Sequence, residues 1–346
     1  MFRALAAPLS ALTTPLLPED YLALANPLWS TELRGRVVAV RRETTRATTL
    51  TIRPGRGWAG HRPGQYVRVG VDVDGVRHWR TYSLTGLPGE RDLRITVQAL
   101  DGGRVSGELA HRTPPGTILR LEAAAGDFVL SPAPGGLLFV TAGTGITPVM
   151  SMVRALAARG ALARATLVHS ARTPADTIFG DELVAYARAG LTVHVRHTAT
   201  AGRLDLAELH RLVPDHRDRD VYVCGPEGLL DAATAVWDAR RLHLERFTPP
   251  ARSAGGTGGS VRFGGTEVQV GPAASLLEAG EAAGLLLPSG CRMGICHGCV
   301  LPLRDGQVRD LRTGEVHGEP GDLVQTCVSG ASGAARIDVP TRKDHR

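Results

Sequence analysis

The chain has 346 residues, which is enough for two or three domains, and its 43% hydrophobic content is typical of a folded globular protein. Its formal net charge is +6, and Lys343 is the only lysine among its 40 basic residues. This preference for arginine over lysine is no sign of nucleic-acid binding. Four of the five cysteines form one metal-ligand pattern, which leaves no disulfide framework, and no apolar run is long enough to span a membrane. We therefore expect a cytoplasmic protein, which could lie at the inner face of the membrane.

Residues 1–34 form an arm punctuated by prolines. Its start, with Arg3 followed by apolar residues, superficially resembles a signal peptide, but prolines interrupt the apolar stretch and no clear cleavage site follows. Apolar residues between Tyr21 and Trp29 have spacings that allow one short amphipathic helix. We expect this arm to fold over a neighbouring domain.

Residues 35–133 carry short segments of alternating apolar and polar residues, separated by turns such as the hairpin signal Asp74-Gly75. This pattern predicts a small antiparallel barrel, interrupted by one helix from Gly103 to Ala110. The expected strands are Arg36–Val40, Thr48–Ile52, Tyr66–Val73, Val76–Leu84, Leu93–Ala99 and Thr117–Glu122.

In residues 134–250 the pattern changes to strands that alternate with helices, which predicts βαβ units and a parallel sheet. The expected strands are Leu137–Thr141, Thr166–His169, Leu191–Arg196, Asp220–Cys224 and, at one edge, His243–Phe247. The expected helices are Pro148–Ala158, Asp181–Ala189, Asp205–Leu212 and Glu227–Arg240.

Residues 251–260 belong to a linker rich in proline, glycine and serine. The last domain, residues 261–346, predicts a helix packed on a small mixed sheet, which is a β-grasp layout. Its expected elements are a hairpin (Val261–Phe263 with Glu267–Val270), a helix (Ser275–Ala283) and short strands that end at Ala335–Val339.

This last domain contains a C-x4-C-x2-C motif and a distant fourth cysteine, the spacing of plant-type 2Fe-2S clusters. Glycines at 290, 294 and 298 would let the loop turn tightly, and Arg292 would offset the negative charge of four thiolates. A zinc knuckle or a disulfide knot is the alternative, but zinc motifs more often contain paired C-x2-C units. The predicted cluster ligands are Cys291, Cys296, Cys299 and Cys327.

Two motifs in the barrel suit a flavin, which needs a surface for its ring, a hydrogen-bonding group near N5 and donors for its phosphates. Tyr82 offers an aromatic face, Ser83 a hydroxyl and Arg80 a charged fork. Ser106 and the N–H groups at a helix start add a site for the second phosphate. The run Arg80-Thr81-Tyr82-Ser83 is weak alone, because Tyr and Thr are common in strands, but Gly103-Arg104-Val105-Ser106 follows about twenty residues later.

Two turns in the parallel-sheet domain suit a dinucleotide. The segment Thr141-Ala142-Gly143-Thr144-Gly145-Ile146-Thr147-Pro148 opens a helix, whose positive end would attract a pyrophosphate. It differs from GxGxxG, so a standard Rossmann dehydrogenase is not indicated, and a plain βα turn is the alternative. Cys224-Gly225-Pro226 closes the last inner strand, so its thiol would point into the ligand crevice, although a lone cysteine is more often inert core.

Two arginines bear on the choice of nicotinamide cofactor. Arg172 and Arg203 lie just past strand ends on the same side of the predicted sheet, where they could grip a 2′-phosphate. This placement favours NADPH, with NADH as the alternative.

The order of flavin barrel, nucleotide sheet and iron–sulfur domain resembles the ferredoxin-NADP reductase superfamily, specifically its members with a C-terminal plant-type ferredoxin domain. The resemblance spans about residues 35–346. It implies that Tyr82 and Ser83 flank the flavin ring of FAD and that the Gly103-to-Ser106 element meets the FAD pyrophosphate. It also implies that Thr147 and Cys224 lie near the site of hydride transfer.

Two further segments take part in this resemblance. Glu245-Arg246-Phe247 resembles the end of the family's nucleotide domain, which implies that Phe247 lies near the flavin. The arm, with Asn26-Pro27-Leu28-Trp29, is similar to that of actinobacterial NADPH oxidoreductases that serve membrane acyl-CoA desaturases. One departure from the simple reductases is the missing C-terminal tyrosine over the flavin.

The sequence therefore predicts an oxidoreductase that carries electrons from NADPH through FAD and a 2Fe-2S cluster to an oxygenase or a membrane desaturase. Ser83, Thr147 and Cys224 are expected to position the nicotinamide and flavin rings. The alternative is a redox-sensing or electron-carrying module that binds a cluster but turns over no nicotinamide.

Overall fold

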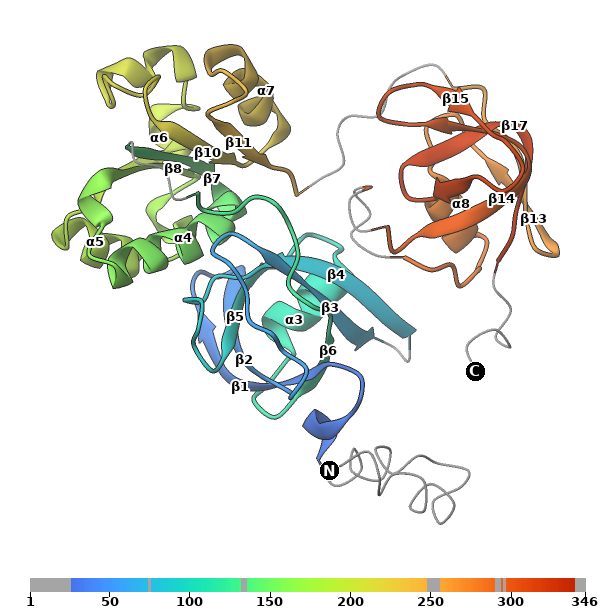
Figure 1. Ribbon diagram of the computed structural model, residues 1–346, viewed down its shortest axis with the longest axis horizontal. Coiled ribbons are helices and arrows are strands. Elements are labelled where there is room, and N and C mark those ends of the chain that lie inside the picture. The colour runs from blue at the N-terminus through green and yellow to red at the C-terminus, as the bar shows by residue number, and fades with distance from the viewer. Residues whose placement is uncertain are drawn as a thin grey trace, which may run out of the picture. The chain divides into compact units, whose positions relative to one another are not determined.

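The computed structural model of the chain describes residues 26–73, 76–131, 136–247, 256–289, 294 and 297–339. The chain divides into two compact units, Met1–Glu245 and Arg246–Arg346. The first unit contains an antiparallel and a parallel sheet, and the second contains a mixed sheet (Figure 1). The predicted fold class, with a barrel, an α/β domain and a β-grasp domain, is confirmed.

The antiparallel sheet closes into a barrel. Its two edge strands are joined by a bridge between Leu84 and Ile95 and by a 2.8 Å hydrogen bond from Thr85 N–H to the Arg94 carbonyl. Helix α3 (Arg104–His111) buries its apolar side against the barrel core. In the order β4-β3-β6-β1-β2-β5, the strands are β1 (Arg34–Arg42), β2 (Ala47–Pro54), β3 (Tyr66–Val73), β4 (Val76–Ser83), β5 (Leu93–Gln98) and β6 (Ile118–Leu121).

The second sheet of this unit is wholly parallel, with the order β11-β10-β7-β8-β9. The chain moves outward from β7 to β9 and then returns to the other side of β7, so the strand order reverses between β7 and β10. Open α/β sheets bind ligands at such a reversal, beyond the carboxyl ends of the strands. The strands are β7 (Leu137–Ala142), β8 (Ala165–Ala171), β9 (Thr192–His197), β10 (Asp220–Cys224) and β11 (Leu242–Glu245).

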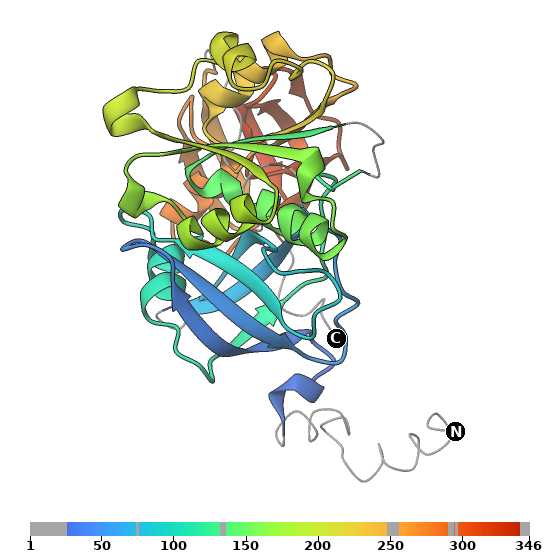
Figure 2. The same cartoon turned by 90° about the vertical axis from the view of Figure 1, so that its left-hand side faces the viewer.

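Helices cover both faces of the parallel sheet. In Figures 1 and 2 the green helices α4 and α5 lie between this sheet and the barrel, and α7 covers the other face. The α-helices are α4 (Ile146–Ala158), α5 (Gly180–Arg188), α6 (Thr198–Ala201) and α7 (Glu227–Val236), and the short 3-10 helices are η2 (Gly143–Gly145), η3 (Leu162–Arg164), η4 (Pro174–Asp176) and η5 (Leu206–Arg211).

Two predicted helices differ from the structure. The segment predicted as a helix from Asp205 to Leu212 is the 3-10 helix η5, whose first turn is capped by the Asp205 carboxylate, which accepts from Ala207 N–H at 2.9 Å. Helix α7 ends at Val236 instead of Arg240. Trp237 adopts an extended conformation there, because its buried indole donates to the His216 carbonyl at 3.0 Å.

Tyr222 fastens the connection between the barrel and the parallel sheet. It is fully buried in β10, and its hydroxyl accepts from Ser131 N–H at 2.8 Å and donates to the Val129 carbonyl at 3.3 Å. Its ring packs edge-on against Phe128 and stacks on His243, with ring centroids 5.5 and 4.3 Å apart. The end of the barrel segment is thus anchored to β10, an inner strand of the sheet.

The second unit has a mixed sheet in the order β13-β12-β17-β14-β15, with β16 paired to β14. Helix α8 (Leu276–Ala282) starts at a capping box in which Ser275 and Glu278 exchange hydrogen bonds of 3.2 and 3.1 Å. The sequence pattern predicts short strands here, but β14 and β17 are long. Irregularities in their pairing, at two places, are typical of β-bulges, which bend strands. The strands are β12 (Gly259–Phe263), β13 (Thr266–Val270), β14 (Val300–Asp310), β15 (Val316–His317), β16 (Leu323–Gln325) and β17 (Ser329–Ile337).

Most of the predicted N-terminal arm lies outside the described residues. From Asn26 onward it forms the 3-10 helix η1 (Pro27–Trp29). This helix packs closely on Gly55, because a Cβ added to Gly55 would lie only 2.6 Å from the Leu28 carbonyl oxygen. Arg56 lies over the Trp29 ring at 5.2 Å. Within the described part of the chain, no helix has the length and apolarity needed to cross a membrane.

Candidate functional site

The predicted flavin strand forms the end of β4. Tyr82 packs against the barrel core, and burial raises the pKa of its phenol far above the ordinary value, although Arg80 offsets part of this shift. Tyr82 is therefore neutral and can donate a hydrogen bond. Ser83 is buried, and the Thr81 hydroxyl oxygen is buried without a hydrogen-bond partner among the described residues. An orphaned buried hydroxyl of this kind fits a strand completed by a bound group.

The predicted phosphate element forms the first turn of α3. Ser106 is already engaged there, because its hydroxyl donates to the Gly103 carbonyl at 3.2 Å and accepts from Leu100 N–H at 3.1 Å. A Cβ on Gly103 would lie 2.3 Å from the Ser106 oxygen and 3.0 Å from the Leu100 Cβ, so a larger residue there would displace the serine hydroxyl. Val105 points into the barrel core. The serine therefore orders the turn, and the N–H groups of the helix start are the donors that this turn offers a phosphate.

The two predicted nicotinamide motifs lie against each other at the sheet reversal. A Cβ on Gly145 would lie 2.0 Å from the Cys224 carbonyl oxygen, and one on Gly225 would lie 3.2 Å from the Ala142 Cβ. Gly143 has a φ of +54°, which favours glycine. The loops after β7 and β10 can approach this closely only because their glycines lack side chains.

This packing brings the segments that carry Thr147 and Cys224 together at the sheet reversal. The Thr147 hydroxyl donates to the Thr144 carbonyl at 2.8 Å, one turn back. Cys224 is fully buried, so its thiol is covered by protein instead of open to the crevice as predicted. Burial raises the pKa of the Cys224 thiol, and Glu245 adds to this effect. The neutral thiol is suited to packing and not to nucleophilic attack.

Two titratable residues to which the sequence motifs gave no role, Glu245 and His169, lie at this site. Glu245 pairs in register with Cys224 across β10 and β11, and burial, assisted by the charge of Asp127, raises its pKa to about 7. His169 is fully buried in β8, and its Nδ1 lies 2.8 Å from the Thr141 hydroxyl. Burial lowers the pKa of His169 to about 4, so this histidine is neutral at physiological pH. The signal in the sequence was a titratable residue in a strand of a parallel sheet, where strands are usually buried on both faces.

Arg172 and Arg203 are both exposed at the carboxyl edge of the parallel sheet. Ala199 N–H donates to the Arg172 carbonyl at 3.0 Å, which joins the turn after β8 to helix α6 after β9. Arg196 donates to the Gly202 carbonyl at 2.9 Å and so fixes the loop that precedes Arg203. The two arginines therefore lie in neighbouring segments, which a backbone hydrogen bond joins.

Two of the four predicted cluster ligands, Cys299 and Cys327, are described, and both are buried. Thr326 ties them together, because its N–H and hydroxyl donate to the Cys299 carbonyl at 3.3 and 2.9 Å. Cys291 and Cys296 lie outside the described residues, as do Gly290 and Arg292.

The described part of the cysteine loop is braced by side chains that follow it in the sequence. Gln325 donates from Nε2 to the Gly294 carbonyl at 3.0 Å and lies 3.2 Å from His297 Nδ1. Gly294 and the non-glycine His297 have positive φ values of 73° and 53°. The Arg312 guanidinium, which the sequence motif did not reveal, lies close to Gly294, because a Cβ added to this glycine would be 2.7 Å from Arg312 Nη1.

The charge on this loop fits an anionic cluster. Arg312 forms a 2.6 Å ion pair with Asp310, which raises its pKa, and Cys327 adds to this electrostatic effect. Two buried cysteines beside a tightly turned loop and a guanidinium fit part of the four-thiolate donor set that a 2Fe-2S cluster requires.

Comparisons with known proteins agree with this arrangement of domains. Residues 42–130 match an oxidoreductase FAD-binding domain, residues 139–235 an oxidoreductase NAD-binding domain, and residues 262–332 a 2Fe-2S iron–sulfur cluster binding domain. An NADPH oxidoreductase of Mycobacterium tuberculosis is 51% identical over 95% of this chain and 90% of its own length.

More distant relatives also match most of the chain. A glycine betaine monooxygenase reductase subunit of Pseudomonas aeruginosa is 29% identical over 80% of this chain and 87% of its own length. The solved structure of phthalate dioxygenase reductase, described as a modular structure for electron transfer from pyridine nucleotides to [2Fe-2S], matches with a TM-score of 0.64 and 27% identity. It covers 89% of this chain and 98% of its own.

The close approach at Gly145 generates one prediction. In Gly145→Ala the new Cβ meets the backbone of Cys224, so the start of α4 must move away from β10. We expect reduction of bound flavin by NADPH to slow by about 10-fold or more, because a small displacement of a reacting group is costly. Stopped-flow absorbance of the flavin band measures this rate. Gly180→Ala, where an added Cβ meets Thr177 at an ordinary 3.9 Å, is the control, and equal rates in both variants would contradict the prediction.

The raised pKa of Glu245 generates a second prediction. Between about pH 4.5 and 7 the unfolded chain has lost this proton while the folded chain still holds it, so the free energy of unfolding falls as the pH rises. Glu245→Gln should remove this slope and stabilise the protein at pH 8 by up to about 3 kcal/mol. Urea denaturation of the FAD-loaded chain at pH 5 and 8 measures both. Asp127→Asn should shift the slope to lower pH, and an unchanged slope in Glu245→Gln would refute the assignment.

Proposed function

Because this chain belongs to the ferredoxin reductase family of NAD(P)H oxidoreductases with FAD-binding, NAD-binding and 2Fe-2S domains, we propose that it supplies electrons from NADPH to an oxygenase or a fatty-acyl desaturase. The chain is an oxidoreductase, and its three domains assign FAD, NAD(P)H and a 2Fe-2S cluster as its cofactors. The proposal rests above all on the presence of all three cofactor domains, in this order, within one polypeptide.

The residues of the crevice suit specific roles. When bound, FAD accepts a hydride from the nicotinamide, and the cluster exchanges electrons singly. The neutral Tyr82 would pack on the flavin ring, and the Ser83 hydroxyl would orient its reactive edge. Thr147 and Cys224 are both buried, so they would exclude water from the place where the two rings meet.

Other residues would hold the cofactors' phosphates and the cluster. Arg80 and the N–H groups that begin α3 would bind the FAD phosphates, and the Gly143-to-Gly145 turn would bind the nucleotide pyrophosphate. Cys291, Cys296, Cys299 and Cys327 would hold the iron atoms, and from the family resemblance Phe247 stays a predicted flavin contact.

NADPH is the nicotinamide that the site favours. Arg172 and Arg203 are exposed on neighbouring loops and free of acidic partners among the described residues, so they could bind a 2′-phosphate. A relative with 51% identity is named an NADPH oxidoreductase, which supports the same choice.

The acceptor is proposed from the relatives' names and from the arm. Two relatives are reductase subunits, one of a glycine betaine monooxygenase and one of a stachydrine N-demethylase, which supports an oxygenase as acceptor. The arm favours a membrane desaturase instead. Trp29 is 40% exposed beside Arg56, and an aromatic ring with a cation suits a membrane interface, where the chain would then lie peripherally.

Loss of a cluster ligand should separate reduction of the flavin by NADPH from reduction of a one-electron acceptor. Cys299→Ser, like Cys296→Ser, should lower reduction of a one-electron acceptor such as cytochrome c by about 100-fold or more, because serine is a poor cluster ligand. Bleaching of the flavin by NADPH should stay within about two-fold of the unaltered chain. Cys224→Ser should give the opposite pattern, with slowed bleaching and an intact cluster spectrum. Full cytochrome c reduction by Cys299→Ser would disprove the order of transfer, and absence of bleaching in the unaltered chain would favour an electron-carrying module.

The two exposed arginines should determine the choice of nicotinamide. Arg172→Ala and Arg203→Ala are each expected to raise the Kd of NADPH by about 10-fold and to leave that of NADH unchanged, because only NADPH carries the 2′-phosphate. Stopped-flow titration with each nicotinamide measures this. Arg188→Ala removes an equally exposed charge at the far end of α5 and is the control. Equal weakening of NADPH and NADH would rule out a 2′-phosphate site at these arginines.

A further inference from the structure

Helix α4 carries three polar side chains on the face that meets the barrel. Thr147, Ser151 and Arg154 are spaced four and three residues apart, which places them on one side of a helix. The Ser151 hydroxyl accepts from Gly64 N–H in the barrel at 2.7 Å, and the Arg154 guanidinium donates from Nη1 to the Thr85 carbonyl, also in the barrel. The helix that begins with the nicotinamide motif is therefore bonded to the flavin domain along its length.

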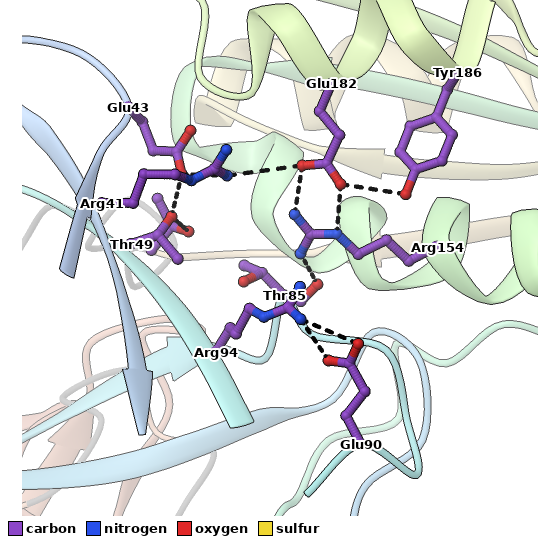
Figure 3. Close-up of polar contacts among 10 residues, drawn as sticks. Arg41, Glu43, Thr49, Thr85, Glu90, Arg94, Arg154, Glu182 and Tyr186 are labelled. Atoms are coloured by element: carbon purple, nitrogen blue, oxygen red, sulfur yellow. Dashed lines mark hydrogen bonds and ion pairs between the residues drawn. The ribbon is translucent and has the colours of Figure 1, made fainter. Parts of the chain in front are cut away.

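Arg154 forms the centre of a polar network at this boundary (Figure 3). Its Nε and Nη2 donate to the two carboxylate oxygens of Glu182 on α5 at 2.9 and 2.6 Å, and its guanidinium lies 5.2 Å from the Phe179 ring centroid. The Tyr186 hydroxyl donates to Glu182 at 3.2 Å. Arg41 in barrel strand β1 approaches Glu182 at 3.8 Å, so this carboxylate also contacts the barrel.

Arg154 and Glu182 keep each other ionised in this network. The Arg154 side chain is only 5% exposed, and burial alone would lower its pKa, but the hydrogen bonds and charge of Glu182 raise it. Burial would likewise raise the pKa of Glu182, and Arg154 outweighs this and lowers it. Both groups therefore stay ionised across the physiological range. A planar guanidinium that binds a carboxylate with two parallel bonds has little freedom to change orientation.

The position of this network relates it to the reaction. Thr85 lies two residues after Ser83, at the end of the flavin strand, and Arg154 lies seven residues after Thr147 on a helix, a rise of about 10 Å. The bond between Arg154 and Thr85 thus joins the strand that ends in the flavin motif to the helix that begins with the nicotinamide motif. Movement of one domain against the other would have to break this bond or the one at Ser151.

We propose that Arg154 is a positioning residue that holds the flavin strand and the nicotinamide helix at the spacing that hydride transfer requires. The inference rests on the proposed roles of Ser83 and Thr147. It adds a residue that touches neither cofactor motif and acts through the Thr85 carbonyl and the Glu182 carboxylate.

Arg154→Lys tests this role, because lysine keeps the charge but cannot bind Glu182 and Thr85 together with a planar fork. At saturating NADPH we expect the limiting rate of flavin reduction to fall by about 10-fold or more, with the Kd of NADPH and the FAD content per chain within about two-fold of the unaltered chain. With NADPH deuterated at the transferred position, the variant should show a full isotope effect. A residue that only stabilised the fold would lower FAD content or the unfolding temperature and leave the rate per bound FAD unchanged.

Arg53→Lys is the matched control. Arg53 binds Asp92 with the same two-pronged geometry, at 2.5 and 2.7 Å, but both residues belong to the barrel. We expect its rate of flavin reduction to stay within about two-fold of the unaltered chain. Glu182→Gln keeps Arg154 and the side-chain volume but removes the carboxylate. Its limiting rate of flavin reduction should therefore fall, as that of Arg154→Lys does.

The outcomes are distinct. If the unaltered chain is not reduced by NADPH, the proposed function fails and this inference falls with it. If the unaltered chain is reduced but Arg154→Lys and Glu182→Gln keep its limiting rate per bound FAD, only the positioning role is overturned. If Arg154→Lys does not fold, the rate of Glu182→Gln decides. A slowed rate in Arg53→Lys equal to that in Arg154→Lys would also overturn the inference.

Discussion

The first unit depends on one close approach between backbones, that of Gly145 to the Cys224 carbonyl. Every other part of the crevice follows from it, because it fixes the loop after β7 against the loop after β10 at the point where the strand order reverses. Thr147 is positioned by the helix that starts there, and Glu245 by the strand next to β10. A single methyl group at residue 145 would separate segments that are eighty residues apart in the sequence.

The iron–sulfur domain relies on a different constraint, the conformation of the loop that carries its cysteines. Positive φ values at Gly294 and His297 are held by Gln325, and Thr326 holds the Cys299 carbonyl. The two residues that precede Cys327 therefore brace the described part of this loop, at Gly294, His297 and Cys299. The fourth predicted ligand thus directly follows the side chains that hold this part of the loop.

Much of this organisation could be predicted from the sequence, and the remainder depends on contacts that no local pattern contains. Strands Tyr66–Val73 and Asp220–Cys224 were predicted with their observed bounds, because turn residues flank them. Helix α7 was predicted too long, since the indole of Trp237 finds its acceptor in His216, far away in the chain. The packing of Gly145 on Cys224 and the role of Arg312 needed the folded chain for the same reason. The predicted roles of Ser83, Thr147 and the two arginines remain predictions, and the proposed experiments address those of Arg172 and Arg203.

The anchoring of the barrel connection by Tyr222 bears on how the protein is made. The segment that contains Phe128 and Ser131 leaves the ribosome some ninety residues before the tyrosine that holds it. A nascent chain can therefore build the barrel and bond it to α4 early, but the anchoring of the Phe128-to-Ser131 segment waits for β10, the fourth strand of that sheet to be synthesised. Since β10 also carries Cys224, the fixing of this segment and the completion of the nicotinamide site become a single late event in biogenesis.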